Sequence, residues 1–120
     1  MSGAMARGVV ILAALMLLPS VILAQGKAEK GKALYTQYCA ACHGATGKGD
    51  GPGAAALNPK PRDLTDKPYM AGLKDEYLFA IVAKGGAAVG KSPLMPPWGA
   101  ALKDEGIREV IAYVRSLSKK

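Results

Sequence analysis

Two cysteines and a histidine stand together in the chain, as Cys39-Ala40-Ala41-Cys42-His43. They are the only cysteines and the only histidine among its 120 residues. Thiols at this spacing lie about one turn apart on a helix, so both can add to the two vinyl groups on one edge of a porphyrin. The imidazole that follows then lies near the iron, for which it is a good ligand. The C-x-x-C-H spacing therefore predicts covalent attachment of haem c.

Three other chemistries use cysteines at this spacing. A thioredoxin-type redox motif needs a strand before it and a helix after it, whereas here a helical pattern precedes Cys39 and a glycine-rich stretch follows His43. A structural zinc site needs four ligands, and the motif supplies three. A disulfide is the ordinary use of two cysteines in an exported protein, but the adjacent histidine favours haem attachment.

The other face of the iron needs a different ligand, because the chain has no second histidine. Met70 and Met95 are the methionines beyond the N-terminal segment. Met95 lies in a proline-bounded stretch, residues 92–98, where the fixed backbone would hold its sulfur in place. Met70 lacks such a setting, and we expect it to fill the core. The pattern predicts His43 and Met95 as axial ligands, a pair that raises the haem potential.

Three helical segments are predicted to position these residues. Hydrophobic periodicity places them at residues 27–39, 75–84 and 104–117, with Asp75 as the N-cap of the second. Gly31 lies inside the first helix, where it costs about 1 kcal/mol relative to alanine. A glycine at this position suggests that another element packs closely against the backbone.

The segments between the helices are long and rich in glycine and proline. They span residues 44–66 and residues 85–97. Loops of this length need something to wrap, and a flat cofactor would serve. The chain contains no alternating strand pattern of useful length and no internal repeat. We therefore expect a small all-α fold with two long Gly/Pro loops.

The first part of the chain, residues 1–24, has a different character. Arg7 is its only charged residue, and residues 9–18 are an uninterrupted apolar run. A basic start, an apolar run of about ten residues and a small residue at the end are typical of a secretory signal. We predict cleavage after Ala24, which leaves residues 25–120 as one periplasmic domain. An uncleaved anchor that holds the domain at the membrane, facing the periplasm, is the alternative, although the run is shorter than the roughly 20 residues of a span.

The chain has a formal net charge of +7. A moderate positive charge is compatible with protein partners that present an acidic docking surface. The lysines are scattered and no aromatic–basic repeat accompanies them, so the sequence gives no indication of nucleic-acid binding.

Residues 27–117 resemble class I c-type cytochromes, of the small soluble bacterial kind with one haem. The resemblance rests on an ordered set of residues: Gly31, Tyr35, Cys39-Ala40-Ala41-Cys42-His43-Gly44, Met95-Pro96 and Tyr113. It implies a cytochrome c-like fold, with three main helices and the two loops around one haem. The first and last helices of this fold cross at right angles, here near Gly31.

The resemblance also implies further contacts to the cofactor. A proline carbonyl normally accepts a hydrogen bond from the ligand histidine and orients its ring, and Pro52 is the candidate. Arg62 and Trp98 are candidates for hydrogen bonds to a haem propionate. Each has a simpler alternative: Pro52 would only stiffen the loop, Arg62 would be a solvated surface charge, and Trp98 would only pack on the ring.

Together these features predict a one-electron carrier, an electron-transfer protein and not an enzyme. Two filled axial positions leave no site for a substrate on the iron, and no pair of titratable residues is placed for acid–base work. One alternative is a haem-bearing subunit of a larger oxidoreductase complex, which would use the same domain. Another is a haem sensor, which requires that Met95 does not bind the iron.

Overall fold

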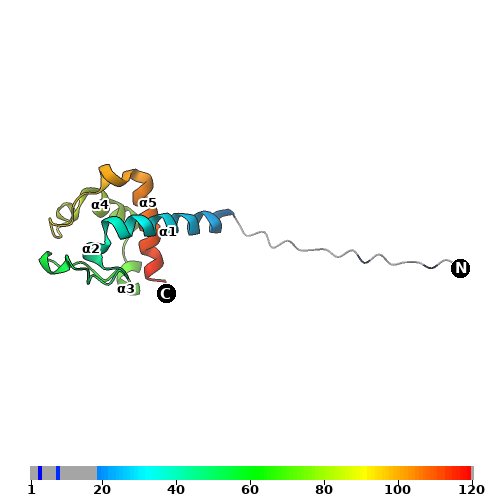
Figure 1. Cartoon of the computed structure of the whole chain (residues 1–120), viewed down its shortest axis with the longest axis horizontal. Helices are drawn as coiled ribbons and strands as arrows, with labels where there is room; N and C mark the ends of the chain where they lie inside the picture. The colour runs from blue at the N-terminus through cyan, green and yellow to red at the C-terminus, as the bar shows by residue number, and fades with distance from the viewer. Residues whose placement is uncertain (1–2, 4–7, 9–18, 120) are drawn as a thin grey trace.

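The computed structural model describes residues 3, 8 and 19–119. This part of the chain consists of helices and loops and contains no strand, as expected for the all-α class. Most of the predicted signal, residues 1–24, lies outside the described residues. In order, the elements are α1 (Pro19–Tyr38), α2 (Ala40–His43), η1 (Ala54–Ala56), α3 (Lys67–Ala71), α4 (Asp75–Lys84), η2 (Gly86–Val89) and α5 (Gly99–Leu117) (Figure 1).

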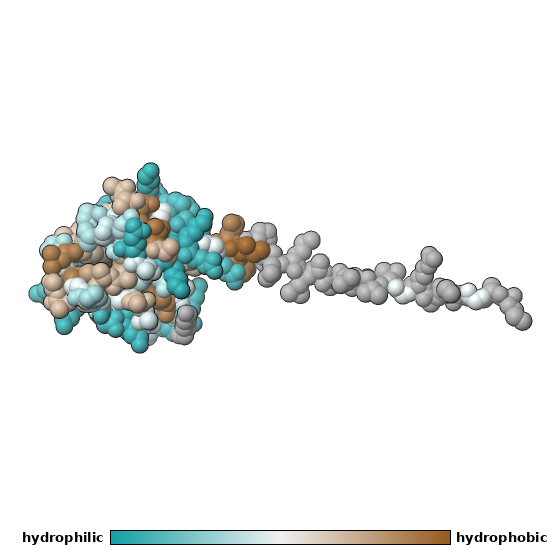
Figure 2. All heavy atoms as spheres, viewed as in Figure 1, coloured by the Kyte–Doolittle hydropathy of each residue, from teal (hydrophilic) through white to brown (hydrophobic). Residues whose placement is uncertain are grey.

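α1 begins at Pro19, earlier than the predicted first helix. Its first turns carry Val21, Ile22 and Leu23, whose side chains are 44%, 56% and 65% exposed. These apolar residues form the brown patch where α1 projects from the domain (Figure 2). The helix continues through Ala24, so cleavage at that residue stays a prediction. Among the residues described, no helix has both the length and the hydropathy needed to cross a membrane.

α1 and α5 cross at Gly31, as predicted (Figure 1). A Cβ atom at this position would overlap the carbonyl oxygen of Glu109 and lie 3.0 Å from the Cβ of Tyr113. Only glycine permits so close an approach of two helix backbones. Beside the crossing, the rings of Tyr35 and Tyr113 pack with their centroids 5.2 Å apart. The core is therefore built around this helix pair, with Ile107 only 1% exposed.

α4 has the bounds that its periodicity predicts, residues 75–84, but its predicted N-cap is wrong. Lys74 occupies the N-cap position, and no side chain caps the helix there. Asp75 is the first residue of the helix, and its carboxylate binds the guanidinium of Arg115 instead, at 2.8 Å. Asp75 therefore lies one position too far along the chain to be the N-cap, and its carboxylate forms an ion pair with α5.

α5 begins at Gly99, ahead of the predicted start at residue 104, but it is interrupted. Lys103 has φ 58° and ψ 174°, which breaks the helical path. The regular helix therefore runs from Asp104 to Leu117, as the apolar periodicity predicts. The preceding turn is tied to α4 by a hydrogen bond from the Trp98 amide to the Val82 carbonyl, 2.9 Å long.

Three short helices were not predicted: η1 and η2 lie within the two loops, and α3 follows the first loop. α3 had a local signal, because the Asp66 side chain accepts a hydrogen bond from the Tyr69 amide and a proline occupies its first turn. η1 and η2 are single turns in alanine- and glycine-rich stretches. These turns make the loops compact, so that they can form the walls of a cavity.

Candidate haem site

The C-x-x-C-H motif lies on α2, which continues directly from α1. The Cys39 amide donates to the carbonyl of Tyr35 at 2.8 Å, and the His43 amide donates to the carbonyl of Cys39 at 2.9 Å. The two thiols are thus held about one helical turn apart, and both are free rather than joined in a disulfide. Since a helix and not a strand precedes the motif, the thioredoxin-type alternative finds no support in the described residues.

The loop after the motif wraps back over the end of α2. Amides of Gly49, Gly51 and Gly53 donate to the carbonyls of His43, Cys42 and Ala41, at 2.7, 3.1 and 2.8 Å respectively. The orphan carbonyls at the C-terminus of the helix are therefore satisfied by loop backbone. From the other side, the buried Tyr35 hydroxyl donates to the Gly44 carbonyl at 2.6 Å. These bonds fix the position of His43 relative to α1.

A cavity lies between the motif and the two loops, and its empty space, open solvent included, is about 860 Å³. Cys39, His43 and Met95 all line this cavity, although they come from distant parts of the chain. The fold thus brings one predicted thiol anchor and both predicted axial ligands to one space. Cys42, the other predicted thiol anchor, does not line the cavity, and a Cβ at Gly53 would be 3.1 Å from its sulfur.

The loop backbone holds Met95 at the cavity. Its carbonyl accepts a hydrogen bond from the Gly86 amide at 3.0 Å, and its own amide donates to the Ser92 carbonyl at 3.2 Å. Gly85 has φ 85°, and a Cβ there would lie 2.8 Å from the Met95 carbonyl oxygen. Glycine at this position lets the two backbone segments meet. Met70, in contrast, is fully buried in the core and does not line the cavity, as expected.

Arg62 lines the cavity, and its guanidinium lies 3.8 Å from the centre of the Tyr69 ring. Trp98 does not line the cavity; its ring packs against Tyr38, with centroids 5.0 Å apart. Pro52 is exposed and is also absent from the cavity wall. The structure therefore places only Arg62, of these three predicted contacts, where a cofactor would lie.

His43 Nδ1 is buried and has no hydrogen-bond partner among the described residues, so the Pro52 carbonyl does not accept from it here. Burial lowers the pKa of His43, and the nearby backbone of Arg62 opposes this in part. Burial, aided by the neighbouring Cys42 thiol, raises the pKa of Cys39 to about 11. Burial also raises the pKa of Tyr35. The surroundings favour neutral groups, which suits a flat apolar cofactor.

Several residues of the cavity wall were not predicted from the sequence to lie at the site. They are Lys60, Tyr69, Tyr77, Lys91 and Ser92. Tyr77 was open to prediction, because it precedes Leu78 on the apolar side of α4. Tyr69 and the two lysines carried no signal, since their positions depend on the path of the loops. No acidic side chain lines the cavity, and the described residues hold no cluster of His, Cys, Asp and Glu suited to zinc.

The donor set fits a haem. One thiol and an imidazole lie at one apolar cavity, a thioether sulfur lies at the same cavity, and basic side chains lie at its wall. Thiols, imidazole and thioether are the groups that hold a c-type haem and its iron. Basic side chains suit the propionate carboxylates, which an otherwise apolar wall would leave without partners.

Sequence comparison assigns the family. A family model described as cytochrome C oxidase, cbb3-type, subunit III matches residues 26–114. The Cbb3-type cytochrome c oxidase subunit FixP of Bradyrhizobium diazoefficiens is 33% identical over 90 residues, which cover 75% of this chain and 27% of the relative. The subunit CcoP of an Azospirillum species is 35% identical over 98 residues, which cover 77% and 29%. This chain thus spans less than a third of the length of these relatives.

Solved structures give the same fold. The KustC0563 c-type cytochrome superimposes with a TM-score of 0.57 at 28% identity, covering 72% of this chain and 95% of that one. The Kuenenia stuttgartiensis reducing HAO-like protein complex Kustc0457/Kustc0458 matches with a TM-score of 0.59 at 31% identity, covering 74% and 41%. The resemblance to c-type cytochromes, the cytochrome c-like fold and haem c as the covalently bound cofactor are thereby confirmed. The chain belongs to the family described as cytochrome C oxidase, cbb3-type, subunit III.

Proposed function

We propose that this chain is an electron-transfer domain that serves as a haem-bearing subunit of a larger redox complex. Cys39 and Cys42 would hold the haem through thioether bonds, and His43 and Met95 would bind its iron. The observation that carries the proposal is the meeting of Cys39, His43 and Met95 at one largely apolar cavity. The bound haem supplies reversible one-electron chemistry at the iron.

A subunit is favoured over a free carrier by the relatives, whose names are those of oxidase subunits. An electron-transfer domain is the common element of both readings. We infer export from residues 1–24, whose sequence pattern is typical of a secretory signal. On this proposal the haem domain faces the periplasm, where it passes electrons between proteins.

Around the cofactor, the chain's own residues would exclude water and bind the propionates. The Ile111, Val114 and Leu78 side chains of the cavity wall keep the iron in an apolar environment. Arg62 is the strongest candidate for a propionate, because it lies at the cavity beside Tyr69. Lys60 and Lys91 offer further positive charge. Trp98 and Pro52 remain weaker candidates because neither lines the cavity.

The ferric absorption spectrum tests the axial ligands. Methionine sulfur on ferric haem gives a weak band at the red end of the visible range, and we expect it in the wild-type protein. Met95→Ala should abolish the band and lower the reduction potential, because thioether sulfur favours reduced iron. Met70→Leu is the matched control: it replaces a core methionine at a cost of less than about 1.5 kcal/mol and should keep the band.

Two results would count against this ligation. A wild-type spectrum without the band would remove Met95 from the iron and leave an open position, as in the haem-sensor alternative. Loss of the band in Met70→Leu, with its retention in Met95→Ala, would exchange the roles of the two methionines.

A further inference from the structure

Arg115, near the end of α5, makes an unusually complete set of hydrogen bonds with the corner between α3 and α4. Its Nη1 atom donates to the carbonyl of Met70 at 2.6 Å, and its Nη2 atom donates to the carbonyl of Leu73 at 2.5 Å. Nε and Nη2 also donate to the carboxylate of Asp75, at 3.0 and 2.8 Å. A single guanidinium thus binds the end of α3, the turn after it and the start of α4.

The two carbonyl contacts matter more than the ion pair. The Asp75 side chain is 71% exposed and the Arg115 side chain 25% exposed. An ion pair with one partner in water contributes little, typically below about 1 kcal/mol. The Met70 carbonyl, in contrast, belongs to the last turn of α3, where it also accepts a backbone hydrogen bond from the Leu73 amide at 3.1 Å. Arg115 adds a charged donor to the Met70 carbonyl and to the Leu73 carbonyl, and hydrogen bonds from a charged donor are stronger than those from a neutral one.

The corner that Arg115 holds is also a wall of the haem cavity. Tyr69, Leu73 and Tyr77, from either side of the corner, all line the cavity. The Arg62 guanidinium lies over the Tyr69 ring, 3.8 Å from the ring centre. Arg115 does not line the cavity, so any influence on the haem passes through this wall.

We propose that Arg115 is a positioning residue for the haem: by binding the Met70 and Leu73 carbonyls it fixes the wall formed by Tyr69, Leu73 and Tyr77, and through Tyr69 it sets the place of Arg62. The wall keeps water from the haem and keeps Arg62 within reach of a propionate. Solvent exposure of the haem and charge near it are two of the properties that set its reduction potential. The proposal rests on the haem binding proposed above.

The test compares haem-loaded variants by redox titration. In Arg115→Gln the corner loosens and water reaches the haem, which favours the more charged ferric form. At a fixed applied potential we expect the ratio of reduced to oxidised protein to fall about threefold or more. Asp75→Asn should leave this ratio near the wild-type value, because the carbonyl contacts remain. Arg115→Lys should restore it in part, since one ammonium can reach one carbonyl.

Arg108→Gln is the matched control for loss of a cation from α5. Its guanidinium lies 5.3 Å from the centre of the Phe79 ring and is not part of the haem cavity. We expect the wild-type potential for this variant. A double-mutant cycle adds a second readout: Arg62→Gln should shift the potential less in the Arg115→Gln background than in the wild type, because Arg62 is already displaced there.

The proposal is overturned if Arg115→Gln lowers the melting temperature but keeps the wild-type potential, since Arg115 would then only stabilise the fold. If Arg115→Gln does not fold, Arg115→Lys is measured instead. Because lysine keeps only one of the carbonyl contacts, its reduction potential should fall below the wild-type value, and an unchanged potential refutes the proposal. An Asp75→Asn shift as large as that of Arg115→Gln would assign the effect to the ion pair. Failure of the haem-binding proposal is distinct, because it would appear in the wild-type spectrum.

Discussion

At the scale of single residues, Gly31 lies where the backbones of the two long helices pack directly against each other. Replacing it by alanine would drive a methyl group into the Glu109 carbonyl, which two packed helices cannot move aside cheaply. Overpacking of this kind costs about 1–3 kcal/mol or more. We therefore expect Gly31→Ala to lower the free energy of unfolding by at least about 2 kcal/mol, measured by chemical denaturation of the haem-loaded protein.

Gly26→Ala is the control, because it lies on the same helix with nothing within 4 Å of a Cβ. Alanine is a better helix former by about 1 kcal/mol, so this variant should be neutral or slightly stabilised. Equal effects at both positions would show that α1 and α5 do not cross as described.

Single residues also mark where prediction from the sequence succeeds and fails. The motif residues and Met95 could be singled out from the sequence, because spacing and flanking prolines act locally, and Gly31 stood out because glycine is costly inside a helix. That Met95 and His43 bind the iron stays a prediction. Trp98 and Pro52 were predicted as cofactor contacts, but neither lies at the cavity. Their places depend on how the loops turn, which no local pattern encodes.

At the scale of elements, periodicity predicted the helices that bury an apolar face. The bounds of α4 and the regular part of α5 follow from it directly. The early start of α1 was not predicted, because residues 19–24 were assigned to the signal and the first helix was predicted to begin at residue 27. The Asp75 side chain was predicted to cap α4, but it forms an ion pair with Arg115, which lies far away in the sequence on α5. Long-range partners of this kind leave no trace in a local pattern.

The break in α5 offers a test of the strain at Lys103. Its φ of 58° and ψ of 174° fall in a region that glycine alone adopts readily, and such residues cost about 1–3 kcal/mol. Lys103→Gly relieves the strain but adds freedom to the unfolded chain. We expect a net gain of about 1 kcal/mol in the free energy of unfolding, seen as a higher denaturation midpoint.

Lys103→Ala separates backbone strain from loss of the lysine charge. It removes the same charge and most of the same side chain but retains the Cβ that causes the strain. No gain is expected from this variant. A gain equal to that of Lys103→Gly would mean that the charge, and not the backbone, is unfavourable there.

At the scale of the whole molecule, the distribution of charge bears on the partner. Lys60, Arg62 and Lys91 line the cavity, and no acidic residue does. Two propionates do not cancel this excess, since an iron(III) porphyrin core is itself positive. We propose that the partner presents acidic groups to this end of the molecule, which opposite charge would steer into place.

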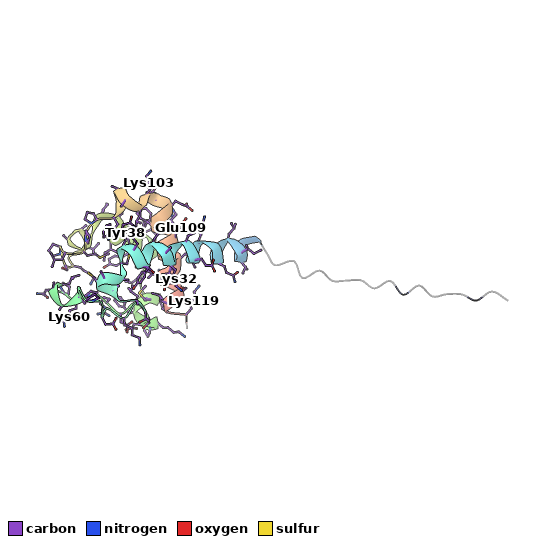
Figure 3. The ribbon with its side chains drawn as sticks, in the orientation of Figure 1. Lys32, Tyr38, Lys60, Lys103, Glu109 and Lys119 are labelled. Carbon is purple, nitrogen blue, oxygen red and sulfur yellow. The ribbon has the colours of Figure 1, made fainter. Side chains whose placement is uncertain are left out.

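Electron transfer with hexacyanoferrate, a small anionic probe, tests this charge. We expect its rate to fall as salt rises, because the Debye length shrinks from about 30 Å at 0.01 M to about 3 Å at 1 M. At low salt the pair Lys60→Gln and Lys91→Gln should slow the reaction about threefold or more. Lys32→Gln, on α1 and away from Lys60 in Figure 3, is the control and should have little effect. A salt-independent rate, or equal slowing by the control, would contradict the acidic-partner proposal.

Covalent attachment of one haem to Cys39 and Cys42 is tested most directly by the intact mass of the purified protein, followed by the masses of its proteolytic fragments. We expect a polypeptide that carries one haem, with the whole mass increment on the fragment that contains Cys39 and Cys42. The same spectrum reports whether residues 1–24 have been removed. A protein that lacks the haem increment, or that has only lost two hydrogens to a disulfide between Cys39 and Cys42, would contradict this attachment.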